Sequence, residues 1–182
     1  MALTATIYRV SVELAHIDRG VYETLDLRLA RHPSETLDYM ATRLLAYCLE
    51  YTEGIAFTDG GISATDEPAV AVRDLTGKVT AWIEVGMPSA ERLHRGHKLA
   101  GRAALYTHRG IAQVLGELNG RGIHRAAEIP VVELDRAFVT ALGESLDRRS
   151  SMSLSVTEGH VYVDVEGGKH LESQLVTHRI AP

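Results

Sequence analysis

The sequence predicts an α/β fold of the mixed α+β kind, in which a central mixed β-sheet is flanked by helices. Three observations predict it. Polar and apolar residues alternate near both ends of the chain, as they do in half-buried antiparallel strands. In the middle, short apolar runs alternate with segments of helical periodicity, which is the order that parallel crossovers produce. The length of 182 residues suits one core, so we expect residues 1–182 to form a single domain.

The composition excludes several classes of protein. Hydrophobic residues make up 45% of the chain and charged residues 24%, a balance typical of soluble globular proteins. The formal net charge of −5 argues against a surface that is basic throughout, so any contact with nucleic acid has to be local. Cys48 is the only cysteine. No disulfide can form within the chain, and the apolar pattern around Cys48 predicts a buried thiol.

The sequence shows no sign of a membrane or export segment. Its first residues, MALTATIYRV, lack the positive and apolar regions of a signal peptide. No apolar run approaches the roughly 20 residues that span a bilayer. We therefore expect a cytoplasmic protein that does not contact a membrane.

The N-terminal residues predict a β-hairpin. Apolar and polar residues alternate over residues 8–14 and again over residues 21–29. Between them, Asp18-Arg19-Gly20 supplies residues that favour a turn.

A helix is predicted to begin at Pro33-Ser34. Ser34 is the expected N-cap, and Glu35 and Asp38 fall in or near the first turn, where the helix dipole favours acids. Apolar residues then recur at three- and four-residue steps from Leu37 to Tyr51. This stripe directs one face of the helix to a core.

A long, partly irregular connection over residues 54–78 separates this helix from the next strand. It is rich in Gly, Asp, Ser and Thr, and long connections of this kind are more often functional than short ones. Its segment PAVAVRDL fits either a short strand or the start of a helix after Pro68.

Alternating strands and helices are then predicted along the chain. The expected order is a strand at 80–85, a helix at 89–100, a strand at 102–108, a helix at 110–120, a strand at 128–134 and a helix at 135–146. The C-terminus returns to alternation over residues 152–156 and 161–165, with turns at Glu158-Gly159 and Gly167-Gly168. These features predict a C-terminal antiparallel meander and make the sheet mixed.

Four acidic residues are the candidates for chemistry. The sequence contains no phosphate-binding P-loop, GxGxxG, HExxH, GxSxG or CxxC motif. The acids are Glu35 at the helix start, Asp66 and Glu67 before Pro68, and Glu84 near a strand end. Three of them have a simpler interpretation: Glu35 suits the helix dipole, Asp66 suits a turn, and Glu84 could lie at the rim of a half-exposed strand face.

Together the acids predict a metal site. If the helix start, the loop and the strand end are neighbours, the carboxylates of Glu35, Asp66 or Glu67, and Glu84 converge. Converging carboxylates repel unless a cation joins them, and Mg²⁺ or Mn²⁺ suits oxygen ligands. Such an ion can activate a water to attack phosphorus. The combination therefore predicts phosphodiester hydrolysis.

The helix after Glu84 carries a row of cations. Arg92, Arg95 and Lys98 recur at three-residue steps, so they could balance the acids or meet a phosphate. His94 and His97 have the spacing of a metal pair, but no third ligand is apparent and a solvated basic face is the simpler interpretation.

The chain resembles the YaeQ family of small bacterial proteins. The resemblance rests on LARHPSET, TDEPAV, WIEVGMP and ALYTHRG, in this order after the N-terminal hairpin. It covers nearly the whole chain and is strongest over residues 1–110. It implies a compact variant of the PD-(D/E)XK nuclease fold, in which Glu35 is the helix acid, Asp66 or Glu67 the loop acid, and Glu84 the first member of an acid-x-Lys pair.

The chain departs from the nuclease pattern at Gly86, which stands where that pattern has its lysine. Some members of the superfamily supply this cation from the next helix, which makes Arg95 or Lys98 the catalytic candidate here. Lys98 could act as a base, whereas Arg95 could only contribute charge. Two hypotheses follow: a magnesium-dependent nuclease, with Glu84 and Arg95 or Lys98 as its catalytic residues, or a non-catalytic module that binds nucleic acid or another protein.

Overall fold

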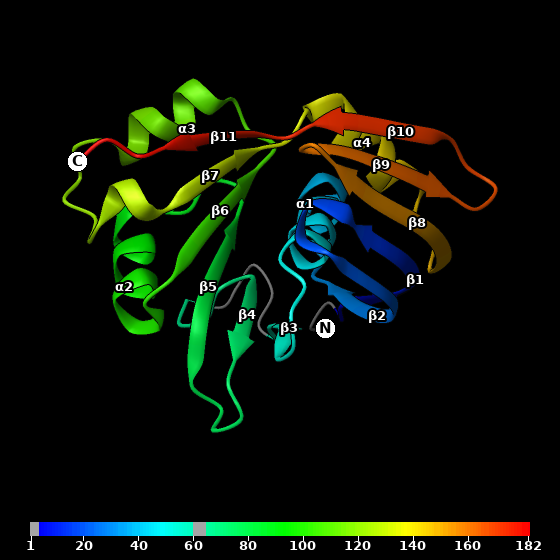
Figure 1. Ribbon diagram of the computed structural model, residues 1–182, viewed down its shortest axis with the longest axis horizontal. Helices are drawn as coiled ribbons and strands as arrows, with labels where there is room; N and C mark the ends of the chain where they lie inside the picture. The colour runs from blue at the N-terminus through cyan, green and yellow to red at the C-terminus, as the bar shows by residue number, and fades with distance from the viewer. Residues whose placement is uncertain (1–3, 60–64) are drawn as a thin grey trace.

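The computed structural model describes residues 4–59 and 65–182 (Figure 1). Within these residues the strands form two mixed sheets rather than one. A five-stranded sheet has the order β10-β9-β8-β1-β2, and a six-stranded sheet has the order β11-β7-β6-β5-β4-β3. The α/β class and the mixed character of the sheets are confirmed, and the division into two sheets is the main departure from the expected architecture.

The five-stranded sheet joins the two ends of the sequence. Its members are β1 (Thr6–His16), β2 (Val21–Arg31), β8 (Arg149–Thr157), β9 (His160–Val165) and β10 (His170–Gln174). The first two form the predicted hairpin, closed by a short 3₁₀ turn η1 (Ile17–Arg19) and by Gly20, whose φ of 66° lies in the left-handed region that glycine adopts without strain. Strand β8 pairs in parallel with β1, while β8, β9 and β10 form an antiparallel meander.

The six-stranded sheet contains the strands from the middle of the chain and the last strand, β11. Its members are β3 (Ile55–Phe57), β4 (Val70–Arg73), β5 (Val79–Val85), β6 (Ala103–Thr107), β7 (Pro130–Glu133) and β11 (Val176–Arg179). Strands β5, β6 and β7 are parallel, as the alternation of strands and helices predicted, and the outer strands are antiparallel. The segment that fitted either a strand or a helix is therefore strand β4.

The helices divide the molecule into layers. Figure 1 shows α1 (Leu37–Leu49) between the two sheets, with α4 (Arg136–Ser145) beside it. Helices α2 (Ala90–Ala100) and α3 (Ile111–Leu118) lie on the outer face of the six-stranded sheet, followed by a 3₁₀ turn η3 (Ala126–Glu128). One buried cluster fills the space around α1 and a second lies under α2 and α3.

Helix α1 is itself largely buried because it lies between the two sheets. Ten of its residues are buried, including Cys48, as predicted. Its start differs from the prediction: Thr36, not Ser34, is the N-cap, and its hydroxyl accepts a hydrogen bond from Tyr39 N at 3.1 Å. Glu35 therefore precedes the helix instead of standing in its first turn. None of the described helices combines the length and apolar character needed to cross a membrane.

Candidate functional site

Glu84 is buried at the carboxyl end of β5, with 2% of its surface exposed. Its Oε1 accepts hydrogen bonds from Trp82 Nε1 and Arg92 Nε, both at 2.6 Å. Trp82 is buried because α2 covers it at Gly96, where an added Cβ would lie 2.4 Å from the indole ring. The strand face that carries Trp82 and Glu84 is thus covered, which contradicts the half-exposed face considered for it.

Arg92 connects Glu84 to the loop that precedes β4. Ser89 caps α2 and places Arg92 in the first turn, next to the end of β5. Its guanidinium also donates to the backbone oxygens of Thr65, at 3.3 Å, and of Glu67. The cation that meets Glu84 therefore comes from the helix after the strand, but it is Arg92, not Arg95 or Lys98.

Glu35 is also buried, and it forms an ion pair with a second arginine, Arg43. Its Oε1 lies 2.9 Å from Arg43 Nη2 and 3.1 Å from Arg43 Nε, and its Oε2 accepts from His32 N at 3.1 Å. Arg43 also donates to Ala30 O, so the pair fastens the turn between β2 and α1. Burial raises the pKa of Glu35, and Arg43 opposes this rise.

The two loop acids point to other partners. Asp66 is exposed and lies 3.8 Å from Arg95 Nη1, and Glu67 lies 3.2 Å from Arg73 Nη2. Arg95 also donates to Thr65 O, and Lys98 is exposed on α2. Arg92 therefore links the backbone of this loop to Glu84. The carboxylates of Asp66 and Glu67 are not part of this contact, because they pair with Arg95 and Arg73.

The predicted magnesium ligands do not form a metal-binding group. In residues 4–59 and 65–182, no three His, Cys, Asp or Glu side chains are arranged to hold an ion. Glu35 and Glu84 are each bound by an arginine instead. His94 and His97 also serve the fold: His94 Nδ1 accepts from His124 N at 3.1 Å, and His97 Nδ1 lies 2.8 Å from His124 O. The arrangement of these side chains therefore does not fit a divalent ion.

A pocket of about 520 Å³ opens beside Glu84. We call it the Glu84 pocket. It lies where the parallel strands β5 and β6 end and where α1 and α4 begin, the edge at which α/β sheets commonly bind ligands. Its lining residues are Ser34, Thr36, Asp38, Tyr39, Glu84, Val85, Gly86, Met87, Pro88, Arg92, His108, Arg109 and Arg136.

Positive charge exceeds negative charge in this pocket. Three arginines face two carboxylates, those of Asp38 and Glu84. Within the described part of the chain, Arg109 and Arg136 form no ion pair, whereas Arg92 neutralises Glu84. Two cations that line the pocket are thus available to an anionic ligand.

Burial shifts the titratable groups of the pocket. It raises the pKa of Glu84, which the neighbouring Arg92 counteracts. It lowers the pKa of His108, whose Nδ1 lies 2.8 Å from Thr42 Oγ1, so the imidazole is neutral at pH 7. Burial and the charge of Glu84 raise the pKa of Tyr39 to about 12, which keeps the phenol protonated. The pocket therefore offers neutral donors beside its cations.

The sequence reasoning missed several residues of this pocket. Tyr39, His108, Arg109 and Arg136 come from three elements that only the fold brings together. A signal existed for two of them, since His108 and Arg109 directly follow β6, a strand predicted to run parallel to the one carrying Glu84. Arg136 had a weaker signal as the first residue of a helix that follows a strand.

Comparisons with known proteins agree with one another. The family described as "YaeQ protein" matches residues 1–174. "Uncharacterized protein YaeQ" of Salmonella typhi is 34% identical over 176 residues, 96% of each chain. The crystal structure of YaeQ protein from Pseudomonas syringae has a TM-score of 0.87 at 33% identity, covering 95% of both chains. The YaeQ protein structure from Xanthomonas axonopodis pv. citri has a TM-score of 0.82 at 28% identity, covering 98% of this chain and 100% of that one.

Proposed function

The chain belongs to the YaeQ family, and we propose that its Glu84 pocket binds a phosphodiester group of nucleic acid without cleaving it. The observation that carries this proposal is the position of Arg92. Its guanidinium contacts the Glu84 carboxylate and the Thr65 and Glu67 backbone oxygens. A divalent ion in a nuclease would need oxygen ligands of this kind, so a fixed side-chain cation takes the place that a metal would require.

The free cations of the pocket favour a phosphate. Arg109 and Arg136 line it without a carboxylate partner in the described residues. A planar guanidinium can donate two parallel hydrogen bonds to phosphate oxygens. The first residues of α1 and α4 lie at the same edge, where the helix dipoles favour negative charge.

The size and charge of the molecule restrict the contact. The volume of about 520 Å³ lies within the range usual for small-ligand pockets. With a net charge of −5, the remaining surface repels a polyanion at long range. We therefore propose a contact with one or a few nucleotides of a flexible strand rather than with a long stretch of duplex.

The alternative is hydrolysis that depends on Mg²⁺ or Mn²⁺, with Glu35, Asp66 or Glu67, and Glu84 as ligands and Arg95 or Lys98 as the catalytic cation. It would require Glu84 to exchange Arg92 for a metal. It would also require Glu35 to leave Arg43 inside the core, where an unpaired charge is costly. The arrangement of the described residues favours binding over this chemistry.

Fluorescence anisotropy with labelled single-stranded DNA and RNA tests the proposal. In EDTA we expect saturable binding that weakens with salt, and Arg109→Gln and Arg136→Gln should each reduce the salt dependence by about one phosphate contact. Arg28→Gln, which removes the same charge from the exposed face of β2, is the matched control.

Three results would separate the hypotheses. Equal affinity of the two pocket variants and Arg28→Gln would overturn the proposed site. No affinity for either strand would overturn the proposed function. Cleavage that appears with Mg²⁺ or Mn²⁺ and disappears in Glu84→Ala would establish the hydrolytic alternative instead.

A further inference from the structure

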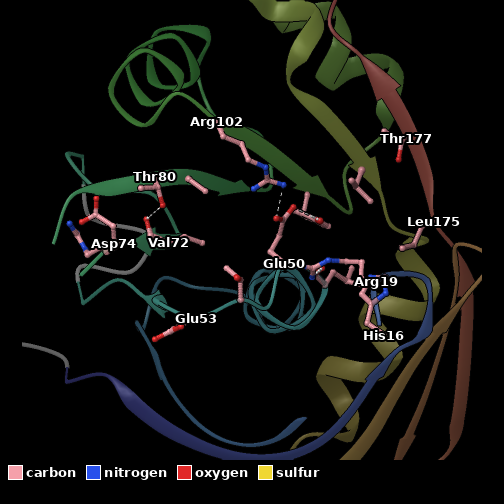
Figure 2. A pocket seen from close by; sticks show the side chains of 16 residues that line it. His16, Arg19, Glu50, Glu53, Val72, Asp74, Thr80, Arg102, Leu175 and Thr177 are labelled. Atoms are coloured by element: carbon pink, nitrogen blue, oxygen red, sulfur yellow. Dashed lines mark hydrogen bonds and ion pairs between the residues drawn. The ribbon is translucent and has the colours of Figure 1, made fainter. Parts of the chain in front are cut away.

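A second pocket lies at the other end of α1, with a volume of about 720 Å³. Its residues come from the C-terminal end of α1, from the end of β1 and from five strands of the six-stranded sheet (Figure 2). We call it the Glu50 pocket. It shares no residue with the Glu84 pocket, and neither the sequence motifs nor the proposed nucleic-acid contact involves it.

One wall of the Glu50 pocket is a fixed polar cluster. Glu50 Oε1 accepts a hydrogen bond from Tyr106 Oη at 2.7 Å, and Glu50 Oε2 lies 2.7 Å from Arg102 Nη2. The Glu50 carboxylate is largely buried, whereas about half of the Arg102 side chain is exposed. Arg102 therefore keeps donors available on its exposed side while Glu50 holds it in place.

Arg19 brings a second cation to the same wall. Its Nη1 donates to Leu49 O at 2.8 Å and its Nη2 to Tyr51 O at 2.9 Å, which fixes the guanidinium at the end of α1. In Figure 2, Glu50 lies between Arg19 and Arg102. Two guanidinium groups and one carboxylate give the surroundings of Glu50 an excess of positive charge. Arg73, Glu53 and Asp74 also line the pocket, and Figure 2 shows Glu53 and Asp74 away from this cluster.

His16 borders this cluster as a neutral group. Burial and the charge of Arg19 lower its pKa, so the imidazole does not add to the charge at pH 7. Its Nδ1 is buried and has no hydrogen-bond partner in residues 4–59 and 65–182. The polar side of the pocket is thus not fully satisfied by the protein itself.

Apolar side chains of the six-stranded sheet and of the segment after β10 lie beside this cluster. Val72, Ala81 and Val132 come from β4, β5 and β7, and Leu175 lies between β10 and β11. A cavity with an apolar floor and a few fixed polar groups has the composition usual for small-molecule sites. The polar cluster and the adjoining apolar side chains together suit a ligand that has one charged end and an apolar body.

We propose that the Glu50 pocket binds a small organic acid, with its anionic group at Arg19 and Arg102 and its apolar body over Val72, Ala81 and Val132. The positive end selects a carboxylate or another compact anion over a neutral group. The apolar floor selects an anion with a hydrocarbon body over acetate. This site is independent of the proposed nucleic-acid contact, since it uses other residues at the other end of α1.

Two-dimensional ¹H–¹⁵N NMR of the intact chain tests the proposal, with hexanoate as the probe. We expect saturable shifts of the amides of Ala81, Val132 and Thr177, with a dissociation constant on the order of 1 mM for so small a ligand. Acetate, which lacks the apolar body, and 1-hexanol, which lacks the charge, should bind at least about fivefold more weakly.

Two variants locate the binding. Arg102→Gln should weaken hexanoate at least about fivefold, whereas Arg28→Gln on the exposed face of β2 removes the same charge outside both pockets and should leave the affinity unchanged. Thr177→Phe fills the pocket from its exposed rim and should abolish the shifts even if Arg102→Gln perturbs the fold. Equal responses to hexanoate and 1-hexanol, equal affinities of Arg102→Gln and Arg28→Gln, or no saturable shift would each overturn the proposal.

Discussion

Arg92 Nε lies 2.6 Å from Glu84 Oε1, and the same guanidinium donates to the backbone oxygens of Thr65 and Glu67. One side chain therefore joins the end of β5, the first turn of α2 and the loop before β4. The carboxylate that the sequence pattern assigned to a metal is occupied by a cation that belongs to the fold. Four predictions test this arrangement and its surroundings.

Removing Arg92 should destabilise the protein more than removing any exposed arginine. Arg92→Met leaves the buried Glu84 charge without its ion-pair partner, and breaking a buried ion pair in this way costs about 3 kcal/mol. Glu84→Gln combined with Arg92→Met should cost less than the sum of the single changes, because neither charge is then left alone. Urea unfolding measures all three variants.

The control for this cycle is Arg95→Met, three residues further along α2. Arg95 is half exposed and lies 3.8 Å from an exposed carboxylate, so its loss should change the free energy of unfolding by no more than about 0.5 kcal/mol. If Arg92→Met and Arg95→Met are equally stable, the contact between Arg92 and Glu84 does not contribute as described.

Divalent ions should not stabilise the protein. Because Glu35 and Glu84 are already paired with Arg43 and Arg92, we expect the melting temperature in about 10 mM Mg²⁺ or Mn²⁺ to equal that in EDTA, as a ligand that binds only the native state would raise it. Thermal unfolding followed by circular dichroism measures this. A rise that disappears in Glu84→Ala would show that a metal displaces Arg92.

A lysine at position 86, where the resemblance to the nuclease pattern placed one, should be poorly tolerated for a backbone reason. Gly86 has a φ of 83°, and its N–H donates to Tyr106 O at 2.9 Å as the chain leaves β5. A residue with a side chain costs about 1–2 kcal/mol in this left-handed region, and a Cβ would also contact the Tyr39 ring at 3.5 Å.

We therefore expect Gly86→Lys to lower the free energy of unfolding by at least this amount. Gly86→Asn should be milder, because Asn tolerates left-handed backbone better than Lys. Chemical denaturation compares the two. Equal stability of Gly86→Lys and the parent chain would refute the conformational explanation for glycine at this position.

Acid should weaken the fold through its buried imidazoles. Burial lowers the pKa of His16 and His108 below the ordinary value of about 6.5. Between the lowered value and about 6.5 the unfolded chain binds more protons than the native chain, so stability is complete above this window and falls as the pH decreases through it.

The buried carboxyls act in the opposite direction, because burial raises the pKa of Glu35 and Glu84 and the native state then holds their protons more tightly. A difference measurement separates the two contributions. The free energy of unfolding of His16→Phe should depend less on pH between about 5 and 6.5 than that of the parent chain. Parallel curves for the two proteins would contradict the assignment of His16.

Much of the fold could be predicted because it is encoded locally. The alternation along β1 and β2 and the residues of the turn at Gly20 specify a hairpin wherever it packs. Ser89 and Asp135 cap α2 and α4 at the residues where these helices were predicted to begin. Strand periodicity, helix periodicity and helix caps depend on residues close together in the sequence. They can therefore be recognised without knowing which elements pack against one another.

The division into two sheets was not predictable in the same way. Whether β8 pairs with β1 or with a strand of the middle region depends on contacts between residues far apart in the sequence, such as Val12 and Met152. The alternation pattern of a strand shows which of its faces is buried, but it does not determine which strand pairs with it. The single central sheet was therefore the simplest arrangement of the predicted strands, and the structure replaces it with two.

The sequence drew attention to Glu84, which lines a pocket in the structure, but it did not indicate that Arg92 contacts Glu84. The basic row on α2 was visible, yet which of three arginine and lysine residues meets Glu84 depends on how the turn after Gly86 sets the helix against the strand. Of these three residues, only Arg92 lies in the first turn of α2, three residues after the Ser89 cap. A count of residues from the expected cap could have ranked Arg92 above Arg95 and Lys98.

The parallel pairing of β1 with β8 has a consequence for a chain leaving the ribosome. The β1–β2 hairpin emerges early, but one edge of β1 has no neighbour until residues 149–157 have been made. At ordinary elongation rates this interval is on the order of ten seconds. Strand β11, near the C-terminus, completes the other sheet later still. The edge of β1 that pairs with β8 therefore stays unpaired from the synthesis of the hairpin until the synthesis of residues 149–157.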